Sequence, residues 1–135
     1  RSTWYHLCTN SCQQMLNTLS RIAEPMKEHT EHSFSPLPGV LADEFSPYCR
    51  DVYNVLVEMN AMISSGDYSN ADEVSERAKE LKHALAGLRK KQTLHLHQSS
   101  GSLRVEFVYL NLIQESHELL SEARNLLRGG KKFFE

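Results

Sequence analysis

Residues 103–128 read LRVEFVYLNLIQESHELLSEARNLLR, and this stretch decides the fold. At about 100° per residue, its apolar side chains cover roughly half of a helix circumference. One edge of this arc is formed by Val105, Tyr109, Leu112, Leu119, Ala123 and Leu126, and the other by Leu110, Ile113, Leu120 and Leu127. A helix that is apolar over so wide an arc has to contact more than one neighbour. We therefore expect it to be the central helix of an all-α bundle.

Three other segments carry apolar residues at the three- and four-residue steps of an amphipathic helix. Their seams are Trp4, Cys8, Cys12, Met15, Leu19, Ile22 and Met26; Phe45, Tyr48, Val52, Val55, Met59 and Met62; and Val74, Ala78, Leu81, Leu85 and Leu88. The predicted helices span about residues 3–28, 46–65, 69–97 and 102–128. Because most links are short, neighbouring helices should be antiparallel. The sequence predicts a single domain over residues 1–135, an antiparallel four-helix bundle.

Ser46 and Pro47 predict the start of the second helix, because they suit the N-cap and the first helical position. Asp43 and Glu44 would fit a start one turn earlier. Residues 33–46 are rich in Ser, Pro and Gly and are predicted to form a long connection. The apolar residues expected to hold this connection on the bundle are Phe34, Leu37, Val40 and Phe45.

The link between the second and third helices carries its own markers. Gly66 lies where a helix commonly ends. Ser69, with Asp72 three residues later, resembles a capping box and predicts the next helix start. Glu73 and Arg77 are four residues apart and are expected to form an ion pair on that helix.

Composition and motifs exclude several classes of function. The 135 residues carry 15 Lys and Arg against 17 Asp and Glu, a net charge of −2, so nucleic acid is not an expected partner. No apolar run approaches the roughly 20 residues that span a bilayer. Three cysteines argue against a secreted disulfide scaffold and favour the cytoplasm. No nucleophile elbow, phosphate loop or dinucleotide fingerprint occurs, so we predict no catalytic residue, no enzyme activity and no cofactor.

Two pairs of residues have spacings that metals use. Cys8 and Cys12 are four residues apart, but both lie on an apolar seam, and we expect them to pack as small hydrophobic side chains. Glu80 and His83 have the Glu-x-x-His spacing of di-iron bundles. His83 lies nearly opposite the seam of its helix and is expected to face outward. No metal ligand is therefore assigned.

The other histidines lie near helix ends and on the fourth helix. His29 and His32, and likewise His95 and His97, should meet at one end of an up-down bundle, where a surface metal site is an alternative to a solvated surface. His117 stands at the boundary of the apolar arc. A single histidine on a helical bundle is typical of phosphotransfer domains, but their His-x-x-Lys-Gly pattern is absent. We expect boundary packing with a hydrogen bond to a neighbour.

A basic cluster lies near the end of the chain. Arg124, Arg128, Lys131 and Lys132 surround Gly129-Gly130, which is expected to end the fourth helix. Cytoplasmic basic residues close to anionic lipid contribute about 1 kcal/mol each. These four residues are predicted to form a membrane-proximal basic patch, with ordinary pairing to the helix C-terminus as the alternative.

Several segments of the sequence resemble a known family. They are YHLCTN at residues 5–10, GDYSNAD at residues 66–72, and YLNLIQE at residues 109–115 continued by NLLR at 125–128 and KKF at 131–133. On these residues most of the chain resembles the C-terminal PhoU-like domain of bacterial sodium/phosphate (Na/Pi) cotransporter-related proteins. The resemblance implies a cytoplasmic regulatory bundle, at the inner membrane, that modulates phosphate uptake. Its expected partner is an upstream transmembrane domain of the same chain, consistent with a sequence that begins at Arg1 without Met.

The sequence departs from this family at the metal-binding motif. PhoU proteins have two three-helix repeats and bind metal clusters through Glu/Asp-x-x-x-Asp motifs. Here Glu115 is followed four residues later by Leu119, and Glu118 by Glu122. Metal binding is therefore not carried over to this chain.

Two further hypotheses stay open. The first is a soluble helical adaptor that binds a partner protein, or a second copy of itself, through an exposed face of the fourth helix. The second is a metal-dependent enzyme or sensor that uses the histidines.

Overall fold

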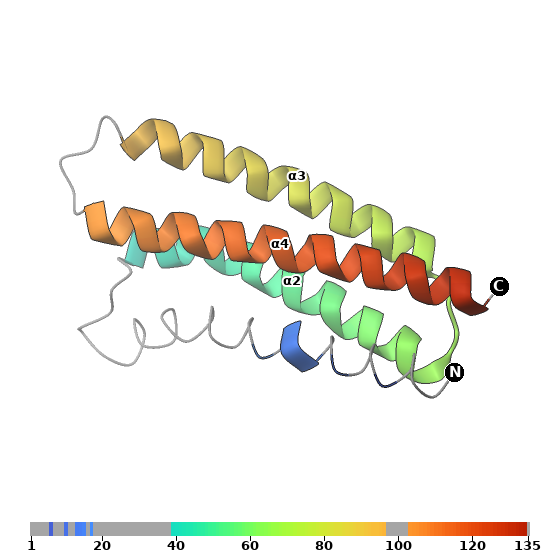
Figure 1. The fold of residues 1–135 in the computed structure, drawn as a ribbon. Coiled ribbons are helices and arrows are strands. Elements are labelled where there is room, and N and C mark those ends of the chain that lie inside the picture. Colours follow the sequence, from blue (N-terminus) through green and yellow to red (C-terminus); the bar gives the residue numbers. More distant parts are fainter. Residues whose placement is uncertain are drawn as a thin grey trace.

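The computed structural model describes residues 6, 10, 13–15, 17, 39–96 and 103–134. They contain three long helices, α2 (Gly39–Ser65), α3 (Ala71–Leu96) and α4 (Leu103–Phe134), and no strand lies within these ranges. α2 and α4 run in one direction and α3 in the other, and each helix packs against the other two (Figure 1). The predicted all-α bundle is confirmed, and helices that follow one another along the chain are antiparallel, whereas α2 and α4 pack in parallel.

The predicted seams form the core. The buried side chains include Val52, Val55 and Met59 of α2; Val74, Ala78 and Leu85 of α3; and Tyr109, Ile113, Leu120 and Leu127 of α4. Met15, from the first predicted helix, is buried in the same cluster. The Tyr109 ring meets the Phe45 ring edge to face, with centroids 6.0 Å apart. Both edges of the apolar arc of α4 are thus largely covered, because α2 and α3 pack against it.

The second helix begins earlier than predicted. α2 starts at Gly39, so Pro47 lies inside the helix rather than at its first position. An interior proline costs about 3 kcal/mol, because it removes a backbone donor. Ala42 and Phe45 are buried and extend the apolar stripe across the proline. Burial of a phenylalanine side chain is worth about 1.5–3 kcal/mol, which offsets much of that cost.

The apolar residues that were expected to hold the 33–46 connection on the bundle differ in their burial. Phe45 is fully buried, whereas Val40 is 78% exposed on the first turn of α2, so the prediction for Val40 was wrong. Phe34 and Leu37 lie outside the described residues.

The fourth helix continues past its predicted end. α4 runs through Gly129-Gly130 to Phe134. A helical glycine costs only about 1 kcal/mol relative to alanine, too little to end a well-packed helix. Gly130 is buried, and a Cβ added there would lie 2.6 Å from the Tyr68 hydroxyl oxygen. The glycine is therefore explained by a close approach of Tyr68, which a local pattern cannot reveal.

The turn between α2 and α3 follows the predicted markers in part. Gly66 has a φ of +74°, and its N–H donates to the Met62 carbonyl at 2.8 Å, so it ends α2 as predicted. The third helix begins at Ala71, two residues later than predicted. Asn70 rather than Ser69 precedes the first helical residue, and its carbonyl accepts from the Val74 N–H at 3.0 Å.

The expected ion pair on α3 is replaced by one between helices. Arg77 Nη1 lies 2.6 Å from Glu58 Oε2 of α2, and not beside Glu73. The two paired side chains are each a little less than half exposed.

None of the described helices combines the length and the apolar character that a bilayer span requires.

Candidate functional site

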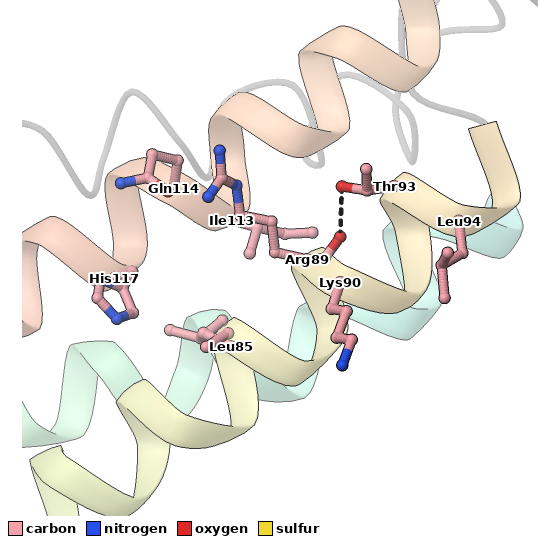
Figure 2. A pocket seen from close by; sticks show the side chains of 9 residues that line it. Leu85, Arg89, Lys90, Thr93, Leu94, Ile113, Gln114 and His117 are labelled. Atoms are coloured by element: carbon pink, nitrogen blue, oxygen red, sulfur yellow. Dashed lines mark hydrogen bonds between the residues drawn. The ribbon is translucent and has the colours of Figure 1, made fainter. Parts of the chain in front are cut away.

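A groove of about 380 Å³ opens between the C-terminal half of α3 and the middle of α4 (Figure 2). We call it the α3–α4 groove. Its lining residues are Leu85, Ala86, Arg89, Lys90, Thr93 and Leu94 of α3, and Ile113, Gln114 and His117 of α4. Leu85 and Ile113 are fully buried, so these two lining residues belong to the packed core. No acidic side chain lines the groove.

Helical spacing places polar residues in and beside the groove on facing edges of α3 and α4. Lys82, Arg89 and Thr93 recur at seven and four residues along one edge of α3, and Gln114 and His117 are three residues apart on α4. The two helices run antiparallel, so both edges line one seam. Which residues of α3 lie opposite which residues of α4 depends on the register between the two helices. The sequence alone does not give that register.

Arg89 reaches across this seam. Figure 2 shows its side chain running from α3 toward α4, with the guanidinium group on the side of Gln114, whereas the Lys90 amine points away. The Arg89 backbone carbonyl accepts a hydrogen bond from Thr93 Oγ1 at 2.8 Å. Its guanidinium is exposed and makes no ion pair with any residue in the described part of the chain. Arg89 thus presents a positive charge at the groove mouth.

His117 is half-buried at the edge of the groove, as the boundary position predicted. Burial lowers the pKa of its imidazole, the nearby positive charge of Lys82 lowers it further, and Arg89 and His83 act in the same direction. Glu118 opposes them. The predicted side-chain hydrogen bond is not made with any described residue; instead, the His117 backbone carbonyl accepts from Ser121 Oγ at 3.2 Å.

The α3–α4 groove is lined mainly by side chains that donate hydrogen bonds. The guanidinium of Arg89 offers several N–H donors, and the imidazole of His117 and the amide of Gln114 offer others. Gln114 Nε2 already donates one hydrogen bond to Glu118 Oε1 at 3.1 Å. Among the lining residues, the hydroxyl of Thr93 is bonded to a backbone carbonyl and is not held by a base. The arrangement suits binding of a negative group better than nucleophilic chemistry.

A second polar site joins α2 to α4. The Tyr109 hydroxyl donates to Glu44 Oε1 at 2.5 Å, and Lys91 Nζ of α3 lies 3.9 Å from Glu44 Oε2. Burial raises the pKa of Tyr109, and the hydrogen bond and charge of Glu44 raise it further. Glu106, one turn before Tyr109, is only 6% exposed, and its Oε2 has no hydrogen-bond partner in the described part of the protein. Sequence reasoning missed this site, because Glu44 was considered only as a helix start.

The four residues of the basic patch lie toward the end of α4. Arg124 Nε donates to Ser75 Oγ at 3.3 Å, and Lys131 Nζ lies 2.8 Å from Asp72 Oδ1, so both contact α3. Arg128 and Lys132 are exposed. His117, Arg124 and Lys131 are seven residues apart, which places them on one edge of α4. The basic patch therefore continues the seam of the α3–α4 groove; its proximity to a membrane stays a prediction.

The candidate metal ligands lie partly inside and partly outside the described ranges. Cys8, Cys12, His29, His32 and His97 lie outside the described residues. His83 and His95 are exposed, and the outward orientation expected for His83 is confirmed. In the ranges that the structure describes, no three His, Cys, Asp or Glu side chains come together as a metal-ligand set. The remaining cysteine, Cys49, is a buried free thiol whose pKa is raised by burial.

No protein-family model, curated protein or solved structure matches this chain. Proposals about its function therefore rest on the residues and on their arrangement.

Proposed function

We propose that the chain is a cytoplasmic regulatory domain of a sodium-dependent phosphate transporter, without catalytic activity of its own. The family resemblance motivates this proposal. One structural observation supports it most. The polar edges of α3 and α4 that line the α3–α4 groove continue into the basic patch. Arg128 and Lys132 are exposed there beside Arg124 and Lys131. Such a stripe suits attraction to anionic headgroups beside a membrane domain.

The mechanism in this proposal is mechanical and electrostatic. The bundle docks beside its own transmembrane domain, and a change in that docking alters the opening of the transporter. The α3 contacts of Arg124 and Lys131 hold the seam in place. The two exposed members of the patch are the ones able to contact lipid or the membrane domain.

The first test is the coding sequence upstream of Arg1. Several apolar spans of about 20 residues, arranged as a repeated half, support the proposal. A start codon directly before Arg1 with no such spans ends it. With the parent transporter in hand, phosphate uptake is compared between the full chain and a chain truncated before Arg1. Unchanged uptake with an unchanged response to external phosphate contradicts a regulatory role.

A soluble adaptor is the second candidate, and an apolar end of the bundle favours it. The exposed residues there are Val40 (78%), Leu94 (60%), Leu103 (58%) and Phe107 (54%). They belong to the start of α2, the end of α3 and the start of α4, which lie at one end of the bundle (Figure 1). This end, rather than a face of α4, is the surface a partner would cover. Sedimentation at several concentrations tests self-association, and a strict monomer removes a second copy as the partner.

A further inference from the structure

Cationic and titratable side chains of α3 and α4 lie in and beside the α3–α4 groove. Arg89 and His117 line the groove, and Lys82 is close enough for its charge to act on His117. Arg89 has no ion-pair partner among the described residues, and no carboxylate lines the groove. Like charges gathered without a counter-charge repel one another, and a bound anion relieves this repulsion.

One acidic group lies near enough to weaken this field. Glu118 of α4 acts on His117 with the opposite sign. Its Oε1 is engaged by the Gln114 amide at 3.1 Å, and it is exposed to solvent. Since Glu118 is not a lining residue, the groove itself keeps an excess of positive charge and of donors.

We propose that the α3–α4 groove binds a small oxyanion between the Arg89 guanidinium and the His117 imidazole. Arginine pairs with two oxygens of a tetrahedral or carboxylate anion at once, which gives the site its geometry. The Gln114 amide keeps a second N–H for the same ligand. The volume of about 380 Å³ lies at the small end of the range for ligand sites and admits a phosphate-sized ion with its water. The proposal stands on the groove alone and does not require the transporter function.

Binding at this site is linked to protonation of His117. The charges of Lys82, His83 and Arg89 on α3 act on it, and so does the opposite charge of Glu118 on α4. Burial and the α3 charges hold the pKa of His117 below its ordinary value. An anion next to the ring favours the imidazolium and raises that pKa. By linkage, the anion binds more tightly as the pH falls through the range in which His117 gains its proton.

The test uses the 135-residue protein, inorganic phosphate and the NMR resonances of the His117 ring. We expect a saturable shift of these resonances at constant ionic strength, with half-saturation in the millimolar range, and a rise in the pKa of His117 when phosphate is present. Arg89→Gln should weaken phosphate binding by about tenfold or more, because a charge-assisted bidentate contact is lost. Arg50→Gln removes the same charge from an exposed position on α2 and should leave binding unchanged.

Three results would overturn the proposal. One is the absence of a saturable response of His117 to phosphate. Another is an equal response of the Arg89→Gln and Arg50→Gln proteins, which would mean general screening by the added salt. The third is binding to vesicles containing phosphatidylglycerol without any response to free phosphate, which would assign the positive seam to a lipid surface. Circular dichroism of each variant confirms that the fold is kept, since both arginines are exposed.

Discussion

The hydroxyl of Tyr109 on α4 donates a hydrogen bond of 2.5 Å to the Glu44 carboxylate on α2. The two residues stand 65 positions apart, so the bond fixes the register of one parallel helix against the other. The ring of Tyr109 is fully buried, and its hydroxyl points out of the core to a half-buried acid. This contact ties the polar site to the hydrophobic core.

Tyr109→Phe should lower the free energy of unfolding by about 1.5–3 kcal/mol, the usual value of a hydrogen bond to a charged group. The ring stays in place, so the loss reports the hydroxyl alone. Urea denaturation measures it. Tyr53→Phe on the exposed face of α2 is the matched control and should change the stability by less than about 0.5 kcal/mol. Equal effects of the two variants would mean that the Glu44 bond contributes nothing.

Gly130→Ala should destabilise the protein by about 1–3 kcal/mol, because the new methyl group would collide with the Tyr68 ring and force one of them to move. Gly87→Ala is the matched control, since no atom lies within 4 Å of a Cβ built there. In α3 that substitution should stabilise by about 0.5–1 kcal/mol. Thermal melts of both variants separate the steric effect from helix propensity. Two variants with the same sign of effect would contradict this account.

His117 should make stability depend on pH. Its pKa in the folded protein lies below the ordinary value near 6.5, so the unfolded chain takes up the proton first as the pH falls. The stability contribution is therefore complete above that value and is lost as the pH falls through it toward the folded pKa. His117→Gln should flatten the decline in the free energy of unfolding between about pH 7 and pH 5.5. His95→Gln, at an exposed position near the end of α3, is the control expected to keep the parent slope.

The ion pair between Arg77 and Glu58 should contribute little. Both side chains are nearly half exposed to water, and ion pairs in such positions are worth about 0–1 kcal/mol. A double-mutant cycle with Arg77→Gln and Glu58→Gln should give a coupling energy in that range, reduced by added salt. The corresponding cycle with Glu73→Gln should give none. Coupling to Glu73 in place of Glu58 would restore the pairing along α3 that the sequence alone suggested.

The seams of the three described helices could be predicted because burial follows apolar periodicity. Val52, Leu85 and Leu120 each lie where the three- and four-residue steps placed them. The predicted helix boundaries were wrong where a tertiary contact outweighs a local preference. Burial of Phe45 favours a helix that begins before Pro47. The close approach of Tyr68 explains Gly130, a residue that by local pattern alone would mark a helix end.

The candidate site was harder to predict than the core. The sequence does not indicate that Arg89 and His117 lie close together, because their proximity depends on the register between α3 and α4. The same holds for Glu44 and Tyr109, which meet only when α2 and α4 are in register. Histidine spacing within one helix suggested metals, whereas the folded chain places cationic side chains of α3 beside His117 of α4.

The close approach of Tyr68 to Gly130 also constrains how this sequence can change over time. A larger residue at position 130 costs less stability once the ring at position 68 has been replaced by something smaller, so the order of substitution matters. That order is open, because a smaller residue at position 68 leaves a space that alanine at position 130 could later fill. We expect diverged copies of this domain to carry either the aromatic ring with glycine or a small side chain with a substituted partner, and rarely a mixture of the two.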